Sequence, residues 1–168
     1  MPDKAIKTHR KGGILVTTVL ALLIGIIAGL RAMTAPAAVA WAAHLDWFDV
    51  SGTPLAFMGY RWTPWIFTAL ALIELVTDQL PNTPSRKVPM QFGARILMGA
   101  LAGGTVGAAG GSLAGGLLAG TLGAIAGTLG GAAARGKLAA AFRRDTPAAL
   151  IEDAVATGGA LLIVAAVP

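Results

Sequence analysis

The sequence predicts an all-α, polytopic membrane protein of about five transmembrane helices, with a glycine-rich helical hairpin and a short interfacial or re-entrant segment. Hydrophobic residues make up 55% of the 168 positions and charged residues only 12%, which is too apolar for a soluble domain of this length. Apolar stretches of about 20 residues, long enough to cross a bilayer, recur along the chain. Basic residues gather in short clusters between these stretches, as orientation signals do.

The first span is expected at residues 14–30, after a basic cytoplasmic tail at residues 1–13. The tail carries Lys4, Lys7, Arg10 and Lys11 against one acid, and Ile14 to Leu30 contain no charge. A cleavable signal peptide is the alternative, because small residues follow at 35–43, but the apolar run is longer than a usual signal core. We therefore expect an uncleaved anchor that opens a single helical membrane domain, residues 14–168.

Residues 36–62 are expected to lie in the outer interface or to dip into it. The four tryptophans and the only tyrosine lie between positions 41 and 65: Trp41, Trp47, Trp62, Trp65 and Tyr60. Indole and phenol rings favour the headgroup layer, where the ring is half buried and its polar atom stays wet. Four spans with a re-entrant segment are the alternative to five.

Four further spans are expected at 64–80, 92–109, 113–134 and 147–167. Two of them open at a Thr-Pro pair, Thr63-Pro64 and Thr146-Pro147, where Thr can cap the helix and Pro fits its first turn. With a cytoplasmic N-terminus, five crossings place most basic residues on the cytoplasmic side and leave Arg31 and Arg61 on the other.

Small residues recur with a four-residue period across the third and fourth of these spans. The series is Gly99, Gly103, Gly107, Gly111, Gly115, Ala119, Gly123, Gly127 and Gly131. One helix over this range would be about 48 Å long, beyond a hydrocarbon core of about 30 Å, so we expect the chain to fold back near Gly110-Gly111-Ser112. The helix faces on which these glycines leave no side chain should pack on each other or on a neighbouring copy. A sliding surface for a gate, or a pore lining, is the alternative.

Four acids lie in apolar context and should face protein or water: Glu74, Asp78, Glu152 and Asp153. Burial of a carboxylate in lipid costs several kcal/mol. We expect these acids near the cytoplasmic face, where Arg86 and Arg95 are the nearest cations. Such a cluster either ties the helices together or carries protons or a cation.

Arg31 is predicted to mark a break between two helices. Glycine precedes it at position 29 and Pro36 follows it. A break would aim the free N–H groups of a new short helix at a polar ligand, with Arg31 alongside. The alternative is an arginine that snorkels at the end of a span.

Several chemistries are not expected. Cysteine is absent, which excludes thiol catalysis and cysteine metal sites, and we find no nucleotide, zinc or nucleophile motif. His44 with Asp46 and Asp49 matches no metal-ligand spacing. We therefore expect no enzyme, cofactor or metal; an enzyme acting on lipid is the third hypothesis, and only His44 approaches its requirements. The basic residues form no continuous face, so nucleic acid is not an expected partner.

Three stretches together resemble a family of small bacterial membrane proteins known as domain of unknown function 4126. They are Gly29 to Pro36, Asp78 to Arg86 leading to Arg95, and Glu152 to Ala156. The resemblance covers nearly the whole chain and implies a bacterial inner-membrane location, without a reaction. It marks the polar turn from Pro81 to Arg86, together with Glu152 and Asp153, as the leading candidate site.

These observations favour a small channel or transporter subunit for an ion or small polar solute. Arg31, Glu74, Asp78, Glu152 and Asp153 would line its polar path. A structural or assembly protein, whose charges only tie helices together, is the alternative. Membrane lipid and further copies of the chain are the expected partners, and the sequence does not name a solute.

Overall fold

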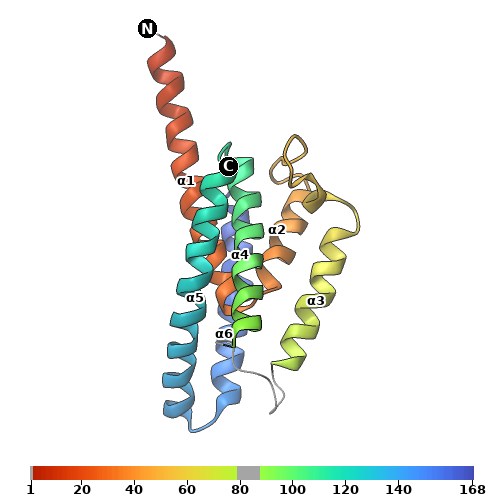
Figure 1. Ribbon diagram of the computed structural model, residues 1–168, viewed down its shortest axis with the longest axis vertical. Helices are drawn as coiled ribbons and strands as arrows, with labels where there is room; N and C mark the ends of the chain where they lie inside the picture. The colour runs from red at the N-terminus through yellow and green to blue at the C-terminus, as the bar shows by residue number, and fades with distance from the viewer. Residues whose placement is uncertain (1, 79–87) are drawn as a thin grey trace.

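The computed structural model describes residues 2–78 and 88–168, and the side chains of residues 12–78 and 88–168. Every regular element in these ranges is helical (Figure 1). In chain order they are α1 (Pro2–Leu30), α2 (Thr34–His44), the short 3-10 helix η1 (Ala56–Gly59), α3 (Thr63–Thr77), α4 (Pro89–Ala109), α5 (Leu113–Phe142) and α6 (Asp145–Ala165). The predicted all-α fold is confirmed.

Four of these helices contain segments that are long and apolar enough to cross a membrane: Gly12–Leu30, Pro89–Ala109, Leu113–Phe142 and Asp145–Ala165. Helix α3 begins at Thr63, close to the predicted start, but its 15 residues extend only about 22 Å. Helix α2 has 11 residues, about 16 Å. The described chain is therefore a polytopic helical membrane protein with four full-length candidate spans and a pair of shorter helices.

The core of the bundle is a backbone-to-backbone packing of α1, α4 and α5. A Cβ atom added to Gly103 of α4 would lie 2.6 Å from the Cα of Gly120 on α5, and one added to Gly25 of α1 would lie 2.8 Å from the same Cα. Real Cβ atoms do not come this close to backbone atoms. Glycine at these positions therefore lets the three helices approach closely enough for dispersion contacts and weak Cα–H hydrogen bonds.

The glycine series does not form one continuous face. Gly99, Gly103 and Gly107 face Gly116 and Gly120, one position later in the chain than the predicted period. Further along α5, Gly123 and Gly127 face the backbone of α1 at Leu22 and Ile26. Gly131 is also buried on α5. Helix α5 lies between α4 and α1, and it contacts each of them through a different set of glycines.

The reversal between α4 and α5 lies where the sequence predicts it. Helix α4 ends at Ala109 and α5 begins at Leu113. Gly111 has a φ of +80°, a left-handed conformation that glycine adopts without the steric cost of a side chain. The Ser112 N–H then donates to the Gly107 carbonyl at 2.8 Å, which satisfies one of the last carbonyls of α4. Gly111 thus makes the turn rather than a helix contact.

The predicted interfacial or re-entrant segment begins with a helix that returns into the bundle, so residues 36–44 follow the re-entrant alternative and not the interfacial one. Nine residues of α2 are buried: Thr34, Ala35, Pro36, Ala37, Ala38, Val39, Ala40, Ala42 and Ala43. The helix runs back alongside α3 and α6 (Figure 1), and the indole N–H of Trp41 donates to the Thr68 hydroxyl at 2.9 Å. A short helix that is apolar on every side is stable only inside a bundle, and the small alanine side chains let it fit there.

This return changes the predicted topology. Because α2 reverses the direction of α1, both chain termini lie at the same end of the molecule (Figure 1). Helix α1 runs parallel to α5, with Gly25 opposite Gly120 and Gly29 opposite Gly127. The basic N-terminal segment and the Arg143-Arg144 turn therefore lie at opposite ends of the bundle. The distribution of basic residues no longer favours a cytoplasmic N-terminus. Arg31 lies with the acids Asp78 and Asp153, so its predicted placement on the opposite side from them is wrong.

The loop between α2 and α3 carries the exposed aromatic side chains at the end where the termini lie. Trp47, Tyr60 and Trp62 of the loop are exposed, as is Trp65 in the first turn of α3, which is typical of residues in the headgroup layer. In this loop the Ser51 N–H donates to the Asp49 carboxylate at 2.7 Å. The side-chain and backbone hydrogen bonds from Ser51 lower the pKa of the Asp49 carboxyl below its usual value.

Candidate functional site

The break between α1 and α2 is held by charged side chains from two other helices. Arg95 of α4 donates from Nη1 to the carbonyl oxygens of Gly29 at 3.1 Å and Leu30 at 2.6 Å, the last residues of α1. Glu74 of α3 accepts the N–H groups of Ala32 at 2.7 Å and Met33 at 2.8 Å, one on each carboxylate oxygen. A cation thus meets the negative end of one helix dipole, and an anion meets the positive end of the next.

Arg31 lies at the centre of this break and is wholly buried. Its Nη1 group donates to Asp78, which follows the last residue of α3, and its Nη2 group forms an ion pair with Asp153 of α6. One guanidinium therefore joins carboxylates from two helices. Burial without such partners would cost several kcal/mol.

Arg95 connects these contacts into one cluster. Its Nη2 atom lies 3.6 Å from a Glu74 carboxylate oxygen and 3.8 Å from an Asp78 oxygen. We call Arg31, Glu74, Asp78, Arg95 and Asp153 the break cluster. Its members come from the α1–α2 junction, α3, α4 and α6, so a change in any one ion pair bears on the packing of several helices.

A second group of charges adjoins the break cluster on α5 and α6. Arg135 binds Asp145 through two contacts, Nε at 3.0 Å and Nη2 at 2.5 Å. Its Nη1 atom also lies 3.5 Å from Glu152, the neighbour of Asp153 in sequence. The sequence indicates Arg135 only as an orientation signal. Arg135 precedes Arg143 by eight residues and Glu152 follows Arg144 by eight, so their equal distance from the turn could have indicated the pair.

The break cluster lies inside the bundle but not at its centre. Asp153 follows the first residue of α6, Asp145, by eight residues, or about 12 Å along the helix. The side chains of Asp78 and Asp153 retain 16% and 17% of their exposure, whereas Arg31 retains none. The carboxylates therefore form the edge of the cluster, and the guanidinium of Arg31 lies behind them.

The structure brings together most of the predicted site residues. Arg31, Glu74, Asp78, Arg95, Glu152 and Asp153 all lie in one region, where α1 and α3 end and near where α4 and α6 begin. Arg86 and the turn from Pro81 lie outside the described residues. The N–H groups that were expected to meet a ligand at the break are bound instead to Glu74.

His44 is not part of this cluster. Its Nδ1 atom lies 3.1 Å from the Gly59 carbonyl oxygen, at the end of α2 that is far from Arg31. Its ring packs edge-on against Trp41. Within the described ranges no group of three or more His, Asp or Glu residues has the arrangement of a metal site.

Replacement of Glu74 by glutamine tests whether the carboxylate holds the break. The amide has one acceptor oxygen, so its NH2 group would face one of the two backbone N–H groups that the carboxylate now accepts. We expect Glu74→Gln to lower the free energy of unfolding in detergent micelles, followed by circular dichroism, by about 1–3 kcal/mol. Asp46→Asn is the matched control on an exposed turn residue and should leave stability unchanged. Equal stability of both variants would show that Glu74 does not hold the break.

Comparisons of the chain with models of protein families, with curated proteins and with solved structures found no match. The resemblance to domain of unknown function 4126 therefore stays a prediction.

Proposed function

We propose that this membrane protein is a subunit of a small channel or transporter for an ion or small polar solute, and that the break cluster is its gate or binding site. The observation that carries the proposal is the buried Arg31, held between Asp78 and Asp153 at a helix break. The fold by itself favours no particular activity, so only the break cluster supports this function.

A contribution to stability alone does not explain why the protein buries these charges. Apolar residues of similar volume generally replace a buried ion pair with equal or greater stability. Ionisable residues within a membrane are costly, and where they occur they most often mark ion paths, proton relays or substrate sites. The cost of burying Arg31 with its two carboxylates therefore favours a functional explanation.

The arrangement also supplies a way to move. Protonation of Asp78 or Asp153, or binding of a cation there, removes a partner from Arg31 and loosens the contact with α3 or α6. Among the described residues the buried Nε of Arg31 has no hydrogen-bond acceptor, so the guanidinium has a donor available for a new partner. Helix breaks with half-helix ends directed at ionic groups are the architecture of many transporters.

The test uses the purified protein in liposomes that enclose a pH-sensitive dye, with imposed gradients of protons, Na⁺ and K⁺. We expect the native chain to dissipate at least one of these gradients faster than empty liposomes do. The triple variant Arg31→Met, Asp78→Leu, Asp153→Leu should remain folded, because it removes the charges together, but should show no flux above empty liposomes. Asp49→Asn, in the exposed loop, is the control that should retain full flux.

A structural or assembly role is the second candidate. It is favoured by the pairing within the cluster, because each of its carboxylates contacts an arginine or a backbone N–H group. This role predicts that the triple variant loses its assembled state in detergent. Flux from the folded triple variant equal to that of the native chain would exclude the break cluster as a gate.

Location and assembly belong to the same proposal. The resemblance supports a bacterial inner membrane. The cytoplasmic N-terminus and the homo-oligomer expected from the sequence stay predictions. The glycine stripes do not provide the surface for that oligomer, because Gly103, Gly116 and Gly120 are buried within the chain. Any contact between copies would use other faces, such as the exposed apolar side chains of α3 and α5.

A further inference from the structure

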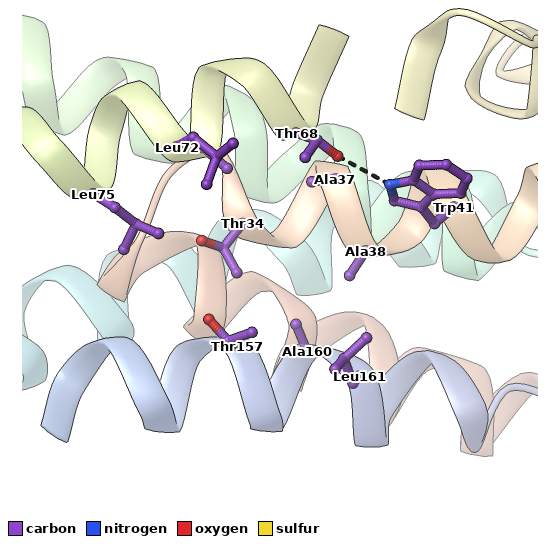
Figure 2. Close-up of a pocket in the computed structure, with 11 residues that line it drawn as sticks. Thr34, Ala37, Ala38, Trp41, Thr68, Leu72, Leu75, Thr157, Ala160 and Leu161 are labelled. Atoms are coloured by element: carbon purple, nitrogen blue, oxygen red, sulfur yellow. Dashed lines mark hydrogen bonds between the residues drawn. The ribbon is translucent and has the colours of Figure 1, made fainter. Parts of the chain in front are cut away.

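A cavity of about 210 Å³ lies between α2, α3 and α6 (Figure 2). Its lining residues Thr34, Leu75 and Thr157 adjoin the break cluster, but none of the cluster's charged side chains lines it. Its floor is formed by alanines of α2 and by Ala160 of α6, and Trp41 closes one end. Leu72 of α3 and Leu161 of α6 line it and are exposed on the surface of the bundle. In a bilayer the cavity therefore opens sideways, toward the lipid.

Three threonines line this otherwise apolar space: Thr34, Thr68 and Thr157. The Thr68 hydroxyl accepts the Trp41 indole N–H and keeps its own hydrogen for a second bond. Within the described chain the hydroxyls of Thr34 and Thr157 have no hydrogen-bond partner. Figure 2 shows both of these oxygens directed toward the end where Leu75 lies.

Other threonines of the bundle satisfy their hydroxyls locally. Thr17, Thr105 and Thr128 each donate to the carbonyl four residues earlier in their own helix. A hydroxyl at membrane depth has no water to bind, so this local bond is the usual solution. The hydroxyls of Thr34 and Thr157 face the cavity without such a bond, which favours an occupant with a polar group.

We propose that this cavity binds a compact, neutral amphiphile from the bilayer: an apolar body with one hydroxyl or carbonyl group. No lining residue is charged, so a neutral ligand fits better than an ion. A cavity of about 150 Å³ accommodates benzene, and this one is larger, at about 210 Å³. The ligand's polar group would bond to Thr34 and Thr157, while its body packs on Ala38, Ala160 and Leu161.

A phospholipid acyl chain is the competing occupant and fits less well. It would fill the apolar part of the cavity but would leave the hydroxyls of Thr34 and Thr157 unsatisfied, at a cost of about 1–3 kcal/mol each. Binding of the amphiphile does not depend on any flux through the protein, so this inference stands apart from the proposed function.

Trp41 lines the cavity and can report on its occupancy. The experiment uses the full chain in liposomes with Trp47, Trp62 and Trp65 replaced by phenylalanine, so that fluorescence comes from Trp41 alone. The probe is 6-bromohexan-1-ol, whose bromine quenches tryptophan on contact. We expect quenching that saturates as the probe concentration rises, because a cavity of fixed size holds a limited number of molecules.

Two substitutions at Thr157 distinguish binding of the probe in the cavity from its dissolution in the surrounding lipid. Thr157→Val keeps the shape and removes the hydroxyl, and should weaken the apparent affinity about three- to tenfold, the usual effect of one hydrogen bond. Thr157→Leu places an apolar side chain at the exposed mouth and should abolish the saturable part. Thr121→Val, on α5 outside the cavity, is the matched control and should behave like the parent.

Quenching that rises without saturation, and equally in the parent and in Thr157→Leu, would mean that the probe only dissolves in the bilayer and would overturn the proposal. Saturable quenching that is unchanged in Thr157→Val would likewise overturn the assigned hydrogen bond. Circular dichroism of each variant in the same liposomes establishes that it is folded before the comparison is made.

Discussion

Replacement of Arg31 by methionine is expected to lower the free energy of unfolding by about 3–5 kcal/mol, the usual cost of leaving one partner of a buried ion pair without its counter-charge. Methionine fills most of the volume of arginine but gives Asp78 and Asp153 no positive charge. Both carboxylates are more than four-fifths buried, so water compensates them only partly. The measurement is a denaturant titration in mixed micelles, followed by circular dichroism.

The control for this prediction is Lys137→Met on α5, which removes one positive charge from an exposed position. It should change stability by less than about 0.5 kcal/mol, as most surface substitutions do. The triple variant that also replaces Asp78 and Asp153 by leucine should recover most of the loss. Equal stability of Arg31→Met and Lys137→Met would mean that the buried ion pairs contribute nothing to the fold.

Addition of one methyl group at Gly120 is expected to have the second large effect. A Cβ atom there would lie 2.9 Å from the Cα of Gly103 and closer still to the Gly99 carbonyl oxygen. Backbone atoms cannot move aside as a flexible side chain can, so α4 and α5 would have to separate. We expect Gly120→Ala to lower the free energy of unfolding by about 3 kcal/mol, the upper end of the usual cost of overpacking.

Gly130→Ala is the matched control on the same helix. A Cβ atom at Gly130 would meet nothing within 4 Å, and alanine is the better helix former by up to about 1 kcal/mol. This variant should therefore be as stable as the native chain or slightly more stable. A similar result for Gly120→Ala would show that α4 and α5 are not in backbone contact.

The glycine-rich hairpin could be predicted because its signals are local. A helix over the whole series exceeds the bilayer. Gly110-Gly111-Ser112 adds a serine to a glycine pair near the middle of the series, and the reversal lies there, between Ala109 and Leu113. The partner of each glycine could not be predicted in the same way. Gly116 and Gly123 both suit close packing, and only the position of α1 decides which one faces it.

The sequence leaves two positions open for α2, interfacial and re-entrant, and the choice of the interfacial one for the five-span count is the error. The tryptophans and Tyr60 favour the headgroup layer, but residues 34–44 contain no charge before His44, and an apolar segment of about 10–14 residues is more often a buried or re-entrant helix than a span. This one error placed Arg31 on the opposite side from Asp78. Each α-helix of the bundle reverses the direction of the chain (Figure 1). One missed reversal at α2 therefore changes the predicted side of the membrane for all residues that precede it.

The acids and Arg95 could be identified from sequence because an ionisable residue in an apolar run needs a partner wherever the helices lie. Which partner each one has depends on three-dimensional contacts. Glu74 and Asp78 lie in the same cluster, yet Glu74 binds the backbone at the break while Asp78 binds Arg31. Their spacing of four residues indicates only that they lie on one helix face.

The unequal lengths of the helices make this protein asymmetric within the membrane. On one side α5 extends over 30 residues, about 45 Å, whereas on the other side α3 extends over only 15 residues, about 22 Å. A bilayer with a hydrocarbon core of about 30 Å that surrounds both has to thin beside α3, and α5 has to tilt or project from it. Because α3 lines the cavity, we expect thinned lipid next to its mouth. Lipids with short chains should gather there, and bilayer thickness itself should influence how α3 lies against α2.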